Sequence, residues 1–134
     1  LMKVESPAPI AMTSAPGKRL PANCTALGKA LLCEHTLEEL KALFNGKLVR
    51  LTEHSVVDID VLYQQLLEVR RTGIAQEKEE NYEFVQCIAT PLYKNGKPVL
   101  ALSISFPTFR YTEEKNEKLK KLLLDAKMSL ELII

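Results

Sequence analysis

The stretch CIATPLYKNGKPVLALSISF, residues 87–106, indicates two β-strands joined by a tight turn. Its β-rich runs at 87–93 and 99–106 flank Lys94-Asn95-Gly96-Lys97, which is a strong hairpin signal, and Pro107 ends the second strand. Both runs are apolar on both faces, which predicts that the hairpin is covered on both sides. Ser103 and Ser105 are therefore expected inside the protein, where each hydroxyl needs a partner from backbone, water or ligand.

The register of this hairpin has two possible solutions. A two-residue turn at Asn95-Gly96 sets Ile88 opposite Ser103. A three-residue loop, Lys94–Gly96, sets Cys87 opposite Ser103 and Val85 opposite Ser105, so that these side chains converge on one face. The Asn-Gly pair alone favours the first solution, but the residues themselves do not decide between them.

Outside the hairpin, the sequence predicts four helices and one further strand. The first helix spans 25–34, and a capping box of Thr36 and Glu39 opens the second, which stops at Asn45-Gly46. Asp58 caps a third helix that ends at Gly73, and Ile74–Glu77 is a short strand followed by an acidic loop or strand edge. Thr112 caps the last helix, whose expected buried stripe is Leu119, Leu122, Leu123, Ala126, Leu130 and Ile133. The expected fold class is α+β, an antiparallel sheet with helices packed on it.

The composition is that of one globular domain of 134 residues, with 46% hydrophobic and 26% charged residues. Because 18 Lys and Arg balance 17 Asp and Glu, no bulk attraction to nucleic acid or to an anionic membrane is expected. No apolar run reaches the roughly 18–20 residues of a membrane span. Three widely spaced cysteines indicate a reduced, cytoplasmic protein, and two histidines without metal-ligand spacing argue against zinc, so no cofactor is expected.

Several short motifs, taken in order, resemble the effector-binding domain of IclR-family transcription regulators. The resemblance extends over about residues 4–134, and its specificity lies in the ordered series rather than in any single piece. The motifs are Gly17-x-x-x-Pro21, Ala26-Leu27-Gly28-Lys29-Ala30-Leu31-Leu32, Val69-Arg70-x-x-Gly73-Ile74-Ala75, Glu79-Glu80, Cys87-Ile88-Ala89-x-Pro91-Leu92, Ala101-Leu102-Ser103-Ile104-Ser105 and Arg110-x-Thr112.

The resemblance implies a GAF-like fold, a curved antiparallel sheet with helices on both faces and a pocket for a small organic acid. It implies that the whole chain, 1–134, is this ligand-sensing domain, shortened at its N-terminus and without the winged helix-turn-helix that binds DNA. The assembly would be a homodimer or homotetramer, with no catalysis and no membrane contact. By resemblance, the ligand-binding residues are the backbone amides of Ala26 and Leu27, the side chains of Glu77, Cys87, Ser103 and Ser105, and Val85 as an apolar wall. This arrangement favours the three-residue hairpin loop.

Three positions depart from the family pattern. Asn23 stands where His is frequent, Glu77 where several members have Asp, and Phe106 where Gly is common. Because the Glu77 carboxylate reaches one methylene further than Asp, these departures bear on ligand identity more than on pocket location.

Simpler interpretations stand beside each functional one. Ser103 and Ser105 could be core serines bonded to backbone, Cys24 and Cys33 packing residues, and Lys29 a surface charge of its helix. Two other functions are alternatives: a GAF-like dimerisation domain without ligand, and a hydrolase. The hydrolase would use Cys87 or Ser103 as nucleophile and His35 or His54 as base, although neither histidine lies in a motif that suggests it.

Overall fold

The computed structural model describes residues 2–4 and 14–134 of the chain. A 3-10 turn, η1 (Ala22–Cys24), leads into the helices α1 (Ala26–Leu32), α2 (Leu37–Phe44) and α3 (Ile59–Thr72). The strands β1 (Ala75–Lys78), β2 (Val85–Lys94) and β3 (Lys97–Pro107) follow, then a second 3-10 turn, η2 (Thr108–Arg110), and the helix α4 (Glu113–Glu131). The predicted α+β class and the order of the elements are confirmed.

The ends of the helices follow the signals in the sequence. Thr36 and Glu39 form the predicted capping box, with reciprocal hydrogen bonds of 3.1 and 3.0 Å between each side chain and the other's backbone amide. Asp58 and Thr112 cap α3 and α4 as expected. Gly73 ends α3 with a φ of 78°, a left-handed conformation that glycine adopts without strain. Local side-chain chemistry thus determines where these helices begin and end.

The sheet has three antiparallel strands in the order β1-β2-β3. Asn95 and Gly96, with φ of 53° and 77°, make a two-residue turn with Lys94 opposite Lys97, so the expected three-residue loop is wrong. An irregularity between Leu92 and Tyr93 then shifts the pairing by one residue. Beyond it, Cys87 lies opposite Ser105 and Ala89 opposite Ser103. Since opposed residues share a face, this bulge restores the convergence of Cys87 with both serines that the turn alone would have removed.

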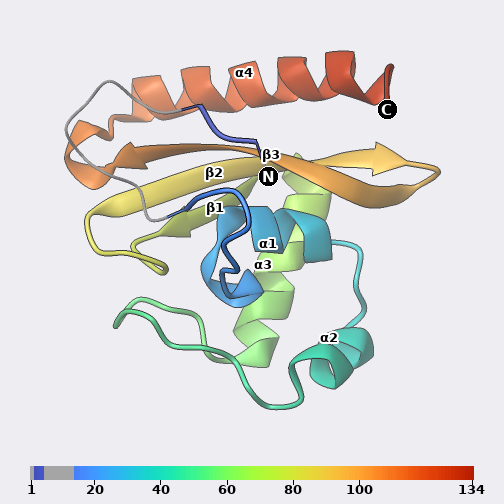
Figure 1. Cartoon of the computed structure of the whole chain (residues 1–134), viewed down its shortest axis with the longest axis vertical. Coiled ribbons are helices and arrows are strands. Elements are labelled where there is room, and N and C mark those ends of the chain that lie inside the picture. The colour runs from blue at the N-terminus through green and yellow to red at the C-terminus, as the bar shows by residue number, and fades with distance from the viewer. Residues whose placement is uncertain (1, 5–13) are drawn as a thin grey trace.

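Helices cover both faces of the sheet (Figure 1). Helix α4 lies along one face, where it packs through Leu123 against Ile74 and Ile88. Helix α1 lies on the other, in front of α3, and α2 packs further out against α3. We refer to the two sides of the sheet as the α4 face and the α1 face.

The buried stripe of α4 differs from the expectation. Leu123 is 1% exposed, but Leu122 is 59% and Ile133 79% exposed. The side of α4 that meets the sheet also carries the buried Asn116, and Lys127 reaches from it over the Tyr93 ring at 4.5 Å. The expected stripe therefore counted outward-facing apolar residues as core and omitted polar residues that face the sheet.

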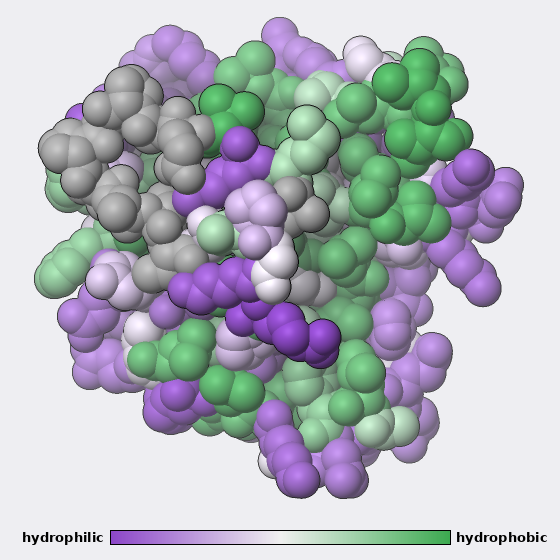
Figure 2. Space-filling view, in the orientation of Figure 1, coloured by the Kyte–Doolittle hydropathy of each residue, from purple (hydrophilic) through white to green (hydrophobic). Residues whose placement is uncertain are grey.

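The serines of β3 are less buried than expected. Ser103 is half-buried and Ser105 is exposed, so the prediction that both lie inside is wrong for Ser105. The reason is the strand order, because β3 is an outer strand and no strand among the described residues pairs with its far edge. In the space-filling view, apolar surface runs from the C-terminal end of α4 toward the hairpin end of the sheet (Figure 2). The exposed apolar residues of these elements include Val99, Leu100, Leu132 and Ile133.

Candidate functional site

A row of polar side chains crosses the α1 face of the sheet. Glu77 of β1 lies opposite Cys87 of β2, which lies opposite Ser105 of β3. The Cys87 thiol and the Ser105 hydroxyl are 2.9 Å apart and share a hydrogen bond. Ser103 lies two residues before Ser105 on the same face, and the buried Val85 lies two residues before Cys87. Five of the seven residues predicted for the ligand site therefore come together on one side of one sheet.

The Glu77 carboxyl group is buried, and only one of its two oxygens has a hydrogen-bond partner among the described residues. Its residue is 2% exposed. Its Oε1 accepts a hydrogen bond of 3.4 Å from the Asn81 amide, while its Oε2 has no partner among the described residues. Burial, and next the negative charge of Glu80, raise the pKa of Glu77 to about 8, against weaker opposing effects that include the Asn81 hydrogen bond. The raised pKa favours the neutral carboxylic acid at pH values where an exposed glutamate is ionised.

The Cys87 thiol is not prepared for nucleophilic chemistry. Burial, and next the charge of Glu77, raise its pKa to about 12, although the hydrogen bond with Ser105 lowers it. The thiolate is the reactive form of cysteine, so a raised pKa makes this group inert. The His54 ring pairs with Glu53 at 3.4 Å and with Glu79 at 3.6 Å. The described contacts thus assemble no Cys–His pair, which is evidence against the hydrolase alternative.

The start of α1 brings the two remaining predicted residues to this face. Thr25 caps the helix by accepting a hydrogen bond of 3.0 Å from the Gly28 amide. Ala26 is 1% exposed and belongs to the same core cluster as Ala75 and Ala89, and Leu27 packs against that cluster. The amides of the first turn have no acceptor within their own helix, so those of Ala26 and Leu27 are donors directed out of its end.

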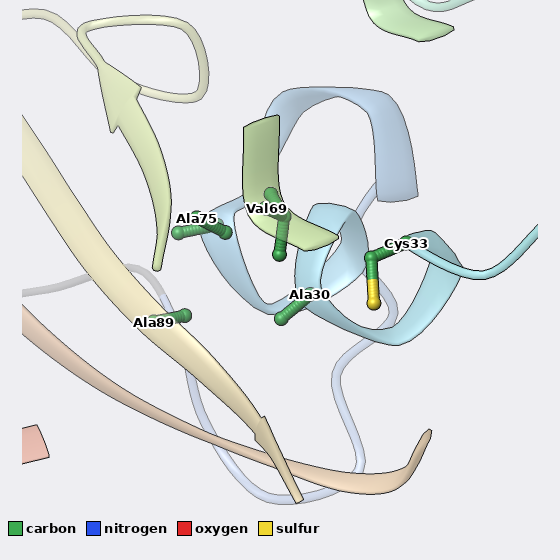
Figure 3. Close-up of a cluster of buried hydrophobic side chains, with 6 residues drawn as sticks. Ala30, Cys33, Val69, Ala75 and Ala89 are labelled. Carbon is green, nitrogen blue, oxygen red and sulfur yellow. The ribbon is translucent and has the colours of Figure 1, made fainter. Parts of the chain in front are cut away.

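Small side chains let α1 approach the sheet closely. Ala30 of α1 and Cys33, the residue just after this helix, lie beside Val69 of α3, with Ala75 and Ala89 of the strands across from them (Figure 3). Gly28 serves the same purpose toward η1, since a Cβ there would lie 2.2 Å from the Ala22 carbonyl oxygen. The glycine of the Ala-Leu-Gly-Lys motif is therefore required by the packing of two backbones.

Lys29 is the principal functional candidate that sequence reasoning missed. It was expected to be a surface charge, but it is 1% exposed and its Nζ lies 2.7 Å from Glu80 Oε1. The helical spacing of apolar residues could have predicted that Lys29 is buried. Position 29 lies on the same side of the helix as Ala26, Ala30 and Cys33, and that side is buried. An isolated lysine on a buried face needs a carboxylate partner, and the acidic loop supplies it.

Further buried polar residues tie three segments to this ion pair. The Ser55 hydroxyl donates to the Glu80 carbonyl at 2.6 Å. The Asn23 amide donates to the carbonyls of Val49 and Val56 at 2.9 and 3.0 Å. We call Asn23, Cys24, Lys29, Ser55 and Glu80 the polar cluster. It joins η1 and α1 to the 45–57 loop and to the turn between β1 and β2, beside Glu77.

Three hollows lie on the opposite side, next to α4, and two of them are larger than the third. One, of about 340 Å³, is lined by Gln86, Phe106 and Asn116 and also borders Glu77 and Cys87. The other, of about 460 Å³, lies between the C-terminal end of α3 and α4. Neither is lined by Ser103 or Ser105. Within residues 2–4 and 14–134, no three His, Cys, Asp or Glu side chains gather as metal ligands. No helix in the same part of the chain has the length and apolarity to cross a membrane.

Comparison with known proteins identifies the class. The family profile "Bacterial transcriptional regulator IclR C-terminal" matches residues 1–131. The HTH-type transcriptional regulator KdgR of Escherichia coli is 35% identical over 126 residues, which are 92% of this chain and 48% of that protein. The HTH-type transcriptional repressor AllR of Salmonella typhimurium is 39% identical over 101 residues, 74% of this chain and 37% of that protein. The chain thus spans about half or less of the length of these curated relatives.

Solved structures of transcriptional regulators have the same fold as this chain. The C-terminal domain of E. coli KdgR superposes with a TM-score of 0.78 at 35% identity, covering 87% of this chain and 72% of that chain. The Agobacterium tumefaciens repressor BlcR superposes with a TM-score of 0.83 at 29% identity, covering 89% of this chain and 49% of that chain. The chain belongs to the IclR family and corresponds to its C-terminal effector-binding domain. Its relatives are transcriptional regulators and not enzymes.

Proposed function

We propose that this chain binds a small organic acid on the α1 face of its sheet, and that the bound acid alters DNA binding by the regulator. One observation carries the proposal: Glu77, Cys87 and Ser105 form a row across three strands, with Ser103 beside them. Ala75, Ala89 and Ala101 of this face are small, and the first turn of α1 packs over it. Polar groups that converge among small apolar residues are typical of ligand sites.

Each residue would have a distinct role at this site. The first-turn amides of Ala26 and Leu27 would donate hydrogen bonds to a carboxylate or carbonyl oxygen of the acid. The hydroxyls of Ser103 and Ser105 would hold its other polar groups. Val85 would supply an apolar wall. Cys87, as an un-ionised thiol, would act by contact and through its hydrogen bond with Ser105.

A solved relative supports the class of ligand. The inducer-binding domain of the Acinetobacter transcription factor PobR, as a double mutant, has been crystallised with 3-hydroxybenzoic acid. It superposes with a TM-score of 0.80 at 26% identity, covering 92% of this chain and 75% of that chain. An aromatic acid, a 2-oxo acid or a sugar acid fits the same expectation for this chain.

The rest of the regulator would work through this domain. We propose a GAF-like sensing domain that assembles as a homodimer or homotetramer, with DNA bound by a winged helix-turn-helix outside this chain. The three free thiols suit a cytoplasmic protein. An acid that binds one arrangement of the subunits more tightly than another would shift the population toward that arrangement.

A thermal-shift screen tests the proposal. The chain is heated with pyruvate, glyoxylate, a 2-oxo sugar acid, a hydroxybenzoate or a short fatty acid. A ligand at about 100 times its dissociation constant should add roughly 2.7 kcal/mol to the free energy of unfolding and raise Tm. The double variant Ser103→Ala/Ser105→Ala should lose the rise, while Ser129→Ala, an exposed serine of α4, should keep it. The absence of a rise with every acid would contradict the proposal and favour a dimerisation domain without ligand.

A further inference from the structure

A glutamate in a site for an anion demands an explanation, because an ionised carboxylate would repel an acid. Resting on the function proposed above, we propose that Glu77 binds the acid in its protonated form, donating a hydrogen bond from Oε2 to the ligand's carboxylate. The site would then select a ligand that presents a hydrogen-bond acceptor to Glu77. Binding would require a proton on this side chain and would take one up from solvent where it is missing.

The surroundings of the carboxyl group indicate which oxygen carries the proton. Oε1 accepts a hydrogen bond from the Asn81 amide, so it is occupied as an acceptor. Oε2 is buried and has no partner among the described residues. A buried polar atom without a partner costs about 1–3 kcal/mol, which a ligand can recover. Since the protonated oxygen is a donor, the complementary group on the ligand is an acceptor.

The charges that face Glu77 point to the same conclusion. From α1 the facing charge is Lys29, from the turn it is Glu80, and from β2 the titratable neighbour is Cys87, whose thiol is neutral. Lys29 and Glu80 form a buried pair at 2.7 Å and cancel each other. An ionised Glu77 would therefore leave one net negative charge at the site, and an anionic ligand would add a second in a region of low dielectric. With Glu77 neutral, the ligand carries the only unbalanced charge.

In the protein without ligand, the raised pKa of Glu77 makes the protonated side chain available for binding. Burial, followed by the charge of Glu80, raises the pKa of Glu77 to about 8. The protonated form therefore dominates at neutral pH, and the ligand meets a donor that is already in place. Above the pKa, only the protonated fraction binds, and the apparent affinity falls in proportion to that fraction.

Isothermal titration calorimetry tests the proposal, with pyruvate and glyoxylate as probes because their carboxylates stay ionised throughout. For the unmodified chain, Kd should rise about tenfold between about pH 6 and about pH 9. Glu77→Gln should bind with a Kd that is nearly the same at both pH values, since its amide Nε2 donates in every protonation state. The control Glu83→Gln removes an exposed carboxylate from the same turn and should keep the tenfold change.

A second measurement does not depend on a variant that folds. Carboxyl ¹³C NMR of the unmodified chain should give a Glu77 pKa that rises when pyruvate is added, because the ligand binds the protonated form. A Kd that does not change with pH, or a pH dependence that persists in Glu77→Gln, would overturn the inference and leave the proposed function standing. Absence of binding by both probes at both pH values would overturn the inference, and the full screen would then decide the proposed function separately.

Discussion

The two faces of the sheet are built from opposite kinds of side chain. The α4 face carries large apolar residues, among them Ile88, Leu102, Ile104 and Phe106, which pack against α4 around Leu123. The α1 face carries Ala75 and Ala89 beside Glu77, Cys87 and Ser105, and both alanines pack in one cluster with α1. The same three strands thus present their large apolar residues on one side and, on the other, small apolar residues beside a row of polar groups.

Taken together with the proposed ligand site, this difference would separate stability from ligand binding in the fold. Large side chains on the α4 face remove much apolar surface from water and hold the sheet to its longest helix. Small side chains on the α1 face bury less apolar surface, and the polar groups of the proposed ligand site lie among them. On the α1 side, the polar cluster around Lys29 lies next to two apolar clusters, and we expect its buried ion pair to be needed for stability.

The largest expected effect comes from breaking that cluster. Lys29→Met leaves the Glu80 carboxylate buried without its partner, and should lower the free energy of unfolding by about 3–5 kcal/mol. Urea denaturation measures the loss. Lys118→Met, which removes an exposed lysine from α4, should change stability by no more than about 0.5 kcal/mol. If Lys29→Met is as mild as this control, the polar cluster does not stabilise the α1 side.

A pair of neighbouring substitutions contrasts the faces directly. Ile88→Ala removes a side chain that is 2% exposed in the core of the α4 face, and should cost about 3 kcal/mol in urea denaturation. Cys87→Ala, one residue earlier on the α1 face, loses a hydrogen bond to an exposed serine and should cost about 1 kcal/mol or less. Equal costs for the two variants would contradict the division between a stabilising face and a binding face.

A further effect, smaller than the loss expected for Ile88→Ala, is a pH dependence of stability. The pKa of Glu77 is about 8 in the folded protein, above the ordinary value of 4.5 for an unfolded chain, so the folded state holds the proton more tightly. Stability is therefore greatest below the unfolded value and is lost as pH rises toward the folded one. Between about pH 6 and about pH 9, the unmodified chain should lose about 2–3 kcal/mol in urea denaturation.

Glu77→Gln should remove most of this loss. A smaller decrease at the alkaline end should remain, because the raised pKa of Cys87 acts in the same direction. A variant whose stability falls as steeply as that of the unmodified chain would show that another group is responsible.

Much of the site was predictable from sequence, but its exact register was not. The Asn95-Gly96 turn was a local signal, and it formed as the residues indicate. The bulge between Leu92 and Tyr93 of β2 depends on how these residues contact β3 and α4. There the Tyr93 amide donates a hydrogen bond of 2.8 Å to Glu131 of α4. That contact joins residues 38 positions apart, so no local pattern contains it.

By itself, the sequence determined the class of the fold, the order of its elements and the caps of α2, α3 and α4, because hydrogen bonds within a few residues decide these features. It also placed Glu77, Cys87 and the two serines together through the ordered motifs. Only the tertiary structure decided that Lys29 is buried against Glu80 and that Ser105 is exposed on an outer strand. It also decided that the Glu77 carboxyl group is buried, which raises its pKa. Burial and pairing across distant segments set these properties, and a residue's own type and spacing do not reveal them.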